Sequence, residues 1–99
     1  MNDKAILVGH KVKPVELMVW ANWFENADKI VKQETLKNKL WVSTVFLGIN
    51  HNFGNGKPLW FETMVFPKNG YGELDMDRYT TWEEAEKGHK KMVKKWEEI

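Results

Sequence analysis

The stretch FLGINHNFGNGKPLWFETMVF, residues 46–66, holds two short runs rich in aromatic and β-branched residues on either side of a polar, glycine-rich segment. Runs of this kind are typical of β-strands, and asparagine, glycine and proline between them are typical of the connection in a hairpin. The connecting segment NHNFGNGKP, residues 50–58, is longer than a tight hairpin turn requires. The sequence therefore predicts a hairpin whose loop has length to spare for a second purpose.

The same alternation of strand and turn signals continues on both sides of this hairpin. The run KIVKQETL, residues 29–36, is followed by the short polar segment KNK and then by LWVSTVFLGIN, residues 40–50. This order predicts two strands joined by a short turn, and residues 59–66 add a third strand. Residues 67–77 carry two glycines and a proline, so we expect a surface loop there. A candidate edge strand, interrupted by a glycine, covers Ala5–Val12.

Two helices are expected, one before and one after the predicted strands. Pro14 is placed to open the first helix, because proline is tolerated at the first helical position. The buried face of this helix, at spacings of three and four residues, would consist of Leu17, Trp20, Ala21 and Phe24. The second helix should begin with a capping box formed by Thr81 and Glu84. Its apolar stripe consists of Trp82, Ala85, His89, Met92, Val93 and Trp96.

These elements predict an α+β fold, a three- to four-stranded antiparallel meander with two helices packed on one face. A chain of 99 residues is too short to fill two cores, so residues 1–99 are expected to form a single domain.

The composition excludes several classes of function. Fifteen Lys and Arg against fourteen Asp and Glu give a net charge of +1, which disfavours binding to nucleic acid or to an anionic membrane. The absence of cysteine excludes disulfides, thiolate chemistry and cysteine-bound metals. The apolar run near the N-terminus, Ala5–Val8, is too short for a signal peptide or a membrane span. We therefore expect a cytoplasmic protein with no cofactor and no contact with the membrane.

Side chains alternate between the two faces of a strand, so the register of the hairpin predicts what each face carries. With Ile49 opposite Leu59, Leu47 faces Phe61 on an apolar face that both helices are expected to cover. The opposite face then collects Phe46, Trp60, Glu62, Met64 and Phe66, together with Lys32 and Glu34 from residues 29–36. Its apolar members would form a larger patch than a soluble monomer usually exposes, so we expect a homodimer that buries this face.

Gly48 stands opposite Trp60 in this register, and the pairing has two interpretations. The indole could cover the backbone that glycine leaves bare. Alternatively, the missing side chain could leave room for a ligand to approach the strand. Both interpretations remain open at this point.

The segments VSTVFLGINHNFGNGKPLWFETMVF, residues 42–66, and RYTTWEEAEKGHKKMV, residues 78–93, carry a resemblance. They resemble a family of short uncharacterised proteins found in bacteriophages, prophages and bacterial genomes, and the likeness covers residues 16–93. The resemblance implies a phage-associated, accessory role. No activity is established for that family, so it assigns no catalytic or binding residue here.

Three side chains, His51, Glu62 and His89, are of the types that serve in metal sites or as acid and base. The predicted faces separate them, because His89 points into the core with the apolar stripe while Glu62 points to the other side of the sheet. A single histidine on an apolar helix face is ordinarily a satisfied core residue, and His51 can order the loop. Thr44 is an ordinary strand residue unless a base lies beside it.

Two functions remain as predictions. The first is a non-catalytic binding module of phage or prophage type that sequesters a host protein or a small anionic, nucleotide-like ligand, including in counter-defence. Its ligand- or partner-binding residues would be His51, Phe53, Gly54, Gly56, Lys57, Trp60, Glu62 and Lys32. The alternative is a small hydrolase using His51 and Glu62, with or without a metal ion. No metal-ligand set is predicted from spacing, and no catalytic residue is assigned.

Overall fold

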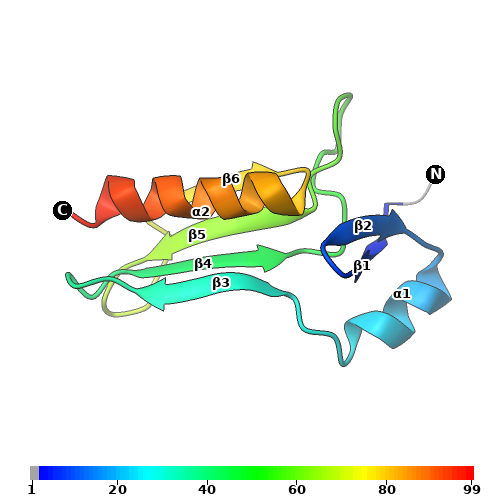
Figure 1. Cartoon of the computed structure of the whole chain (residues 1–99), viewed down its shortest axis with the longest axis horizontal. Coiled ribbons are helices and arrows are strands. Elements are labelled where there is room, and N and C mark those ends of the chain that lie inside the picture. The colour runs from blue at the N-terminus through cyan, green and yellow to red at the C-terminus, as the bar shows by residue number, and fades with distance from the viewer. Residues whose placement is uncertain (1–2) are drawn as a thin grey trace.

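The computed structural model describes residues 3–99, in which two antiparallel sheets and two helices form an α+β fold (Figure 1). The elements are β1 (Ala5–Val8), β2 (Lys11–Pro14), α1 (Leu17–Phe24), β3 (Ile30–Thr35), β4 (Trp41–Phe46), β5 (Phe61–Phe66), β6 (Asp75–Tyr79) and α2 (Trp82–Trp96). Strands β3, β4, β5 and β6 form a four-stranded antiparallel meander in chain order, and β1 and β2 form a separate hairpin. The predicted fold class is confirmed.

The N-terminal segment forms two strands where one was expected. Gly9, with φ of +63°, lies in the turn between β1 and β2, a conformation that glycine adopts without steric cost. Pro14 is the last residue of β2 and pairs with Ala5, so it does not open the helix as predicted. Helix α1 begins three residues later, at Leu17.

Helix α1 differs from expectation in what it covers. None of its residues is fully buried, and Leu17, predicted to lie on the buried stripe, is 58% exposed. The helix packs against β1 and places Trp20 and Phe24 over Gly48. Gly48 has φ of +74°, and a Cβ there would lie 2.7 Å from the Phe24 ring. The indole that covers Gly48 is therefore that of Trp20, and the expected pairing with Trp60 is wrong.

The register between β4 and β5 differs from the prediction by one residue. Phe46 pairs with Phe61 and Val45 with Glu62, whereas Leu47 was expected opposite Phe61. The reason lies beyond the end of β4, where Ile49 bridges to Lys4 and not to Leu59. A shift of one residue moves every side chain of a strand to the other face. The even-numbered residues of β4 consequently face α2.

The shift changes the face predicted for the side chains of β3 but not the face predicted for those of β5. Lys32 pairs with Thr44, and Glu34 pairs with Val42, so both lie on the α2 side and not on the open face where they were expected. The assignment of β5 is unaffected, because Phe61, Thr63 and Val65 face α2 as predicted. Glu62 accordingly lies on the open face.

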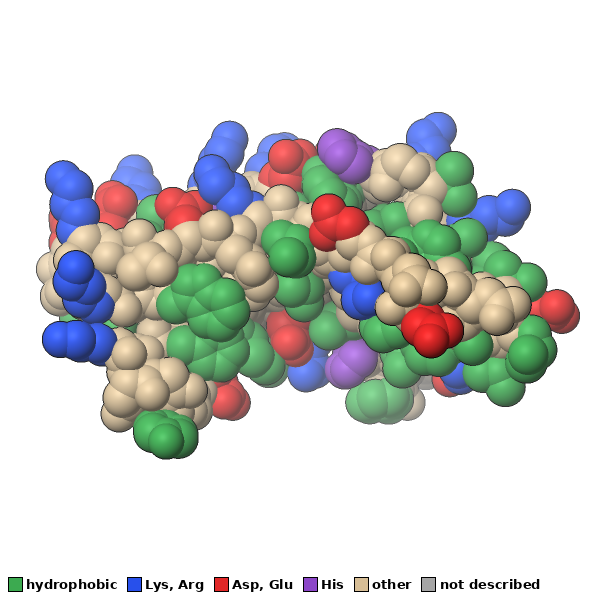
Figure 2. All heavy atoms as spheres, turned by 90° about the horizontal axis from the view of Figure 1, so that it is seen from below, with side chains coloured by type: hydrophobic (Ala, Val, Ile, Leu, Met, Phe, Trp, Pro, Cys, Tyr) green, Lys and Arg blue, Asp and Glu red, His purple; other side chains and the backbone are tan. Residues whose placement is uncertain are grey.

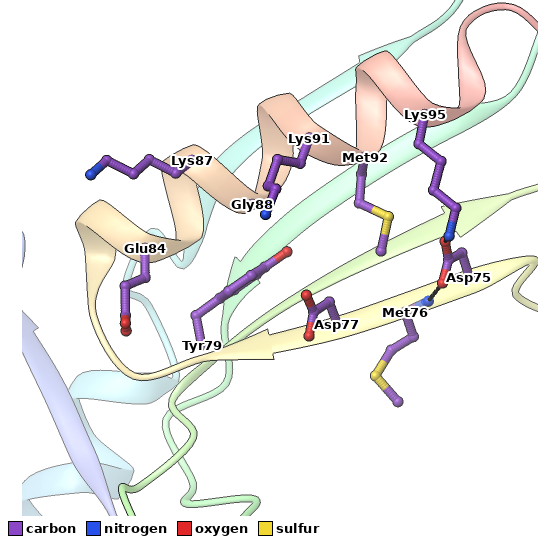
Figure 3. Close-up of a pocket in the computed structure, with 10 residues that line it drawn as sticks. All are labelled: Asp75, Met76, Asp77, Tyr79, Glu84, Lys87, Gly88, Lys91, Met92 and Lys95. Carbon is purple, nitrogen blue, oxygen red and sulfur yellow. Dashed lines mark hydrogen bonds and ion pairs between the residues drawn. The ribbon is translucent and has the colours of Figure 1, made fainter.

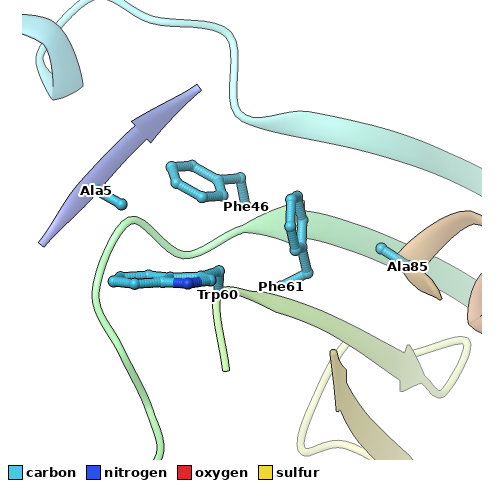
Figure 4. Close-up of a cluster of buried hydrophobic side chains, with 5 residues drawn as sticks. All are labelled: Ala5, Phe46, Trp60, Phe61 and Ala85. Atoms are coloured by element: carbon cyan, nitrogen blue, oxygen red, sulfur yellow. The ribbon is translucent and has the colours of Figure 1, made fainter. Parts of the chain in front are cut away.

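The core lies between the sheet and α2, with β1 closing one end (Figure 4). One cluster joins residues from four parts of the chain: Ala5, Phe46, Trp60, Phe61 and Ala85. A second cluster consists of Leu36, Val42, Val65 and Met92. The predicted capping box of α2 is confirmed, since Thr81 Oγ1 accepts from the backbone N–H of Glu84 while the Glu84 carboxylate accepts from that of Thr81, both at 3.1 Å.

The open face of the sheet carries less apolar surface than expected. Phe46 is 2% exposed and Trp60 is 4% exposed, so both belong to the core. Met64 and Phe66 remain on the open face, where Trp41 stacks on Phe66 with ring centroids 5.3 Å apart. Of the four apolar residues expected on this face, only Met64 and Phe66 are there, and Trp41 joins them. Within residues 3–99, neither helix is long and apolar enough to cross a membrane.

Candidate functional site

The loop between β4 and β5 is organised by two asparagine side chains. Asn50 Oδ1 accepts hydrogen bonds from the backbone N–H groups of Asn52, at 2.8 Å, and Leu59, at 3.0 Å. Asn52 Oδ1 accepts from the N–H of Gly54 at 3.0 Å, and Asn52 Nδ2 donates to the carbonyl of Lys57 at 2.9 Å. Asparagine side chains that bond to nearby backbone in this way replace regular turn hydrogen bonds. The loop is therefore internally cross-linked from one end to the other.

Within this loop, His51 and Phe53 have different environments. His51 is half-buried, and its Nδ1 lies 2.9 Å from the carbonyl oxygen of Ile49, to which it donates. Phe53 is 88% exposed, although its ring centroid lies only 6.1 Å from that of His51. Such exposure is unusual for a phenylalanine and leaves nearly all of its apolar surface in water. The loop therefore presents an aromatic ring on an ordered support.

A hollow of about 740 Å³ lies beneath the loop. It is lined by Asp3, Pro14, Asn50, Asn52, Phe53, Gly54, Asn55, Gly56, Pro58 and Trp60. A second hollow of about 450 Å³ shares Pro14, Pro58 and Trp60 with the first and extends to the start of α2. There the His10 ring stacks on Trp82 with centroids 3.8 Å apart. Together the two hollows form a largely apolar surface around one side of the loop.

The structure brings together six of the eight predicted binding residues and separates two. His51, Phe53, Gly54, Gly56 and Lys57 belong to the loop, and Trp60 contributes to the hollow beneath it while being buried. The two that lie apart are Glu62 and Lys32, which occupy opposite faces of the sheet.

Glu62 and Lys32 each have a partner of opposite charge. Glu62 Oε2 accepts from Arg78 Nε at 2.9 Å on the open face. Lys32 Nζ lies 3.7 Å from Glu34 Oε2 on the other face. No hydrogen bond among residues 3–99 joins Glu62 to His51. In the same residues, no group of three or more His, Asp or Glu side chains is arranged to hold a metal ion.

A chain of hydrogen bonds between side chains crosses the sheet beneath α2. Thr63 Oγ1 and Thr44 Oγ1 are 2.6 Å apart, and Thr44 Oγ1 is 2.6 Å from His89 Nδ1. His89 Nε2 is 2.7 Å from Glu34 Oε2. The Tyr79 hydroxyl donates to Thr63 at 3.1 Å and begins the chain on the opposite side. The prediction that His89 is a satisfied core residue is confirmed, because it is 1% exposed with both ring nitrogens bonded.

The directions of these hydrogen bonds form one consistent series. Glu34, as a carboxylate, only accepts, so His89 donates to it from Nε2, and in the neutral imidazole Nδ1 then accepts from Thr44. Thr44 then accepts from Thr63, which accepts from Tyr79. The order hydroxyl, imidazole, carboxylate also occurs in enzymes that activate a nucleophile. Thr44, however, has no exposed surface, so its hydroxyl is not accessible from solvent in this structure.

A groove of about 470 Å³ runs between β6 and α2 (Figure 3). Lys95 reaches down from α2 to Asp75, with Nζ 2.6 Å from Oδ2, and the Trp96 indole donates to the same oxygen at 2.9 Å. These two hydrogen bonds hold the pKa of Asp75 below its usual value. The Tyr79 ring lies beneath Gly88, and burial raises the pKa of its hydroxyl above 10.

The lowered pKa of Asp75 predicts a contribution to acid stability. Because the folded-state pKa lies below that of the unfolded chain, the stabilisation is complete above about pH 4 and is lost as the pH falls through the folded value. Asp75→Asn should therefore reduce the slope of unfolding free energy against pH in this acidic range. Urea unfolding between pH 7 and pH 2 would measure it, with Asp77→Asn as the control for removing one charge from the same strand. An unchanged slope in Asp75→Asn would contradict the assignment.

Comparisons with protein-family models, with curated proteins and with solved structures find no match.

Sequence reasoning missed the two asparagines that organise the loop and the partners of His89. Each asparagine side chain accepts from the backbone N–H two residues later, Asn50 from Asn52 and Asn52 from Gly54. Asparagine at such positions is a recognisable sequence signal for this kind of turn. Glu34 and Thr44 carry no such local signal, because they lie 55 and 45 residues from His89.

Proposed function

We propose that the protein is a non-catalytic binding module that holds a protein partner at the 50–58 loop. The observation that carries the proposal is the 88% exposure of Phe53 on a loop cross-linked by Asn50 and Asn52. An aromatic ring buried on association contributes a large apolar area. A loop that is already ordered loses little conformational entropy when it binds, which leaves more of that contribution as affinity.

The chemistry of the hollow beneath the loop favours a protein over a small anionic ligand. Its lining consists mainly of Asn, Gly, Pro and aromatic residues, with Asp3 as the charged member. Lys57 is exposed but does not contribute to that lining. Such a surface offers apolar contact and backbone hydrogen bonding and little charge to hold a phosphate. A host protein is the partner that also agrees with the phage-type resemblance of the sequence.

The alternative, a small hydrolase using His51 and Glu62, has less support. Glu62 is paired with Arg78, and His51 donates to the backbone of its own loop. A hydrolase of this kind would need these two groups to meet around a substrate.

The double variant His51→Ala/Phe53→Ala tests the proposal in quantitative capture experiments from bacterial lysate. Proteins retained by the wild type should be lost by the variant. The free energy of unfolding should change by less than about 1 kcal/mol, because the larger side chain removed is already in water. Tyr71→Ala is the matched control, since Tyr71 is an aromatic residue of another loop with 83% exposure.

Three results would contradict the proposal. A folded double variant that retains the same proteins as the wild type excludes the loop as the contact. Equal loss in Tyr71→Ala means that the retained proteins bind exposed aromatic rings without specificity. A double variant that melts several degrees lower and loses binding only in proportion makes the loop a structural element.

A further inference from the structure

Strand β3 forms a free edge of the four-stranded sheet. The strand order places β3 and β6 at the two margins, and β3 lies along the lower margin in Figure 1. Figure 2 views the molecule from this side, where hydrophobic side chains and backbone are interspersed with charges of both signs. Four of the six residues of β3 are exposed. An edge strand presents unpaired backbone groups and is a template for pairing with another strand.

The hydrogen-bond pattern identifies which backbone groups of β3 point outward. Leu36 N–H donates to Leu40 at 2.7 Å in the turn that joins β3 to β4. Hydrogen-bonded pairs alternate along an antiparallel ladder, so Lys32 and Glu34 bond to β4 while Gln33 and Thr35 direct their N–H and C=O groups away from it. No side chain among residues 3–99 accepts from the N–H of Gln33 or Thr35.

The other margin, β6, is protected by its own side chains. Its outward N–H groups belong to Met76 and Arg78. The carboxylate of Asp75 accepts from the N–H of Met76 at 2.8 Å, and that of Asp77 accepts from the N–H of Arg78 at 2.9 Å. Charged side chains that occupy edge groups in this way are a common device against unwanted strand pairing. The two margins therefore differ: β3 has a bulge between Ile30 and Lys32, but beyond it the outward N–H groups of Gln33 and Thr35 have no side-chain acceptor among residues 3–99.

The charges of β3 favour one partner, a second copy of the same strand. Two copies of β3 can pair only where the backbone groups that point away from β4 face each other. In an antiparallel pair, Gln33 can therefore lie opposite residue 31, 33 or 35 of the other copy. The first register sets Lys32 against Lys32, and the third sets Glu34 against Glu34. In the second, Gln33 faces Gln33 and each Lys32 faces Glu34 of the other copy. Oppositely charged cross-strand pairs stabilise antiparallel strands, whereas like charges directly opposite destabilise them.

Strand β6 has no register in which two copies could pair without like charges opposite one another. Placing Met76 opposite itself sets Asp75 against Asp77, and placing Met76 opposite Arg78 sets Asp77 against Asp77. Placing Arg78 opposite itself sets the two arginines against each other. Self-pairing is therefore opposed at β6 and supported at β3.

We propose that two copies of this chain associate through β3, antiparallel about Gln33, so that the two sheets form one continuous sheet. A twofold axis through Gln33 makes both Lys32–Glu34 contacts identical, as in an isologous dimer. This interface replaces the open sheet face on which the homodimer was expected. It does not involve the 50–58 loop, so it is independent of the function proposed above.

Sedimentation and light scattering across the micromolar range would test the proposal. The wild type should have twice the chain mass of 11.7 kDa. Gln33→Pro should have the mass of one chain, because proline removes the central intermolecular donor. It should still fold, since proline is tolerated in an edge strand where the N–H faces solvent. Met76→Pro makes the same change at an outward position of β6 and should keep the mass of two chains.

A pair of charge variants tests the register. Lys32→Glu and Glu34→Lys should each be monomeric, because each sets like charges opposite one another. An equimolar mixture of the two should form a heterodimer, in which both contacts are again between opposite charges. Glu34 also accepts from His89, so folding of Glu34→Lys is checked by circular dichroism, and Gln33→Pro remains decisive if that variant unfolds. A monomeric wild type, a dimeric Gln33→Pro, or an assembly larger than two chains would overturn the proposal.

Discussion

Phe61→Ala should lower the free energy of unfolding by about 3–5 kcal/mol, as expected for removing a phenylalanine from a well-packed core. Phe61 has no exposed surface and belongs to the cluster that joins β1, the sheet and α2. Its ring centroid lies 5.2 Å from that of Phe46 and 6.1 Å from that of Trp82 in an edge-on contact. Alanine would leave a cavity, and the neighbouring rings could fill it only by moving out of their own packed positions.

The measurement is urea unfolding followed by tryptophan fluorescence, for which the chain has six indoles. Phe53→Ala is the matched control, because it makes the same chemical change at a ring that is 88% exposed and should change stability by less than about 0.5 kcal/mol. A small domain has a total stability of about 5–15 kcal/mol, so Phe61→Ala should remove a substantial part of it. Equal effects of the two substitutions would contradict the described core.

Thr44→Val should cost about 2–4 kcal/mol, although valine has nearly the same shape as threonine. The hydroxyl of Thr44 bridges Thr63 and His89, at 2.6 Å from each, and has no access to water. Valine would leave His89 Nδ1 without a donor and the Thr63 hydroxyl without an acceptor. Each buried polar group left unsatisfied costs about 1–3 kcal/mol.

Two further variants make this prediction specific. Thr35→Val changes an exposed threonine on β3 and should be close to neutral. The triple variant Thr44→Val/Thr63→Val/His89→Leu removes the three fully buried members together and should recover part of the loss, because the two remaining ends, Tyr79 and Glu34, are only partly buried and can bond to water. A Thr44→Val protein as stable as the wild type would show that the hydrogen-bonded chain contributes nothing to folding.

The elements that were predicted correctly are those specified by neighbouring residues. The capping box of α2 depends on Thr81 and Glu84, three positions apart, and both of its hydrogen bonds are present. The strands of the meander follow the alternation of aromatic and β-branched residues, and the loop follows its Asn and Gly content. The end of the 67–77 loop was assigned wrongly, because β6 begins within it, at Asp75. Asp75 and Asp77 are residues typical of turns. In the fold their carboxylates accept hydrogen bonds from outward backbone N–H groups of the edge strand β6.

The candidate site likewise contains residues that a local pattern could indicate and residues that only long-range contacts place. His51, Phe53, Gly54, Gly56 and Lys57 are close together because they are close in sequence, so a local pattern could indicate them. Lys32 and Glu62 were joined to that set through the predicted register, and they lie on opposite faces of the sheet. The partners of His89 could not be predicted, since they reach it from β3 and β4 through the packing of α2.

By itself the sequence determined the three strands β3, β4 and β5, the helix α2 and the long loop, because hydrophobic period, capping and turn propensity act over a few residues. Only the tertiary structure decided which face of β4 meets α2. Side chains alternate along a strand, so the sequence pattern alone fits either face towards the core. A shift of one residue in the register decides which face it is. That register is set where Gly48 takes a positive φ beneath Trp20 and Phe24, and where Ile49 pairs with Lys4 from the far end of the chain. These contacts between distant segments placed Phe46 in the core and moved the side chains of Lys32 and Glu34 from the open face of the sheet to the face that α2 covers.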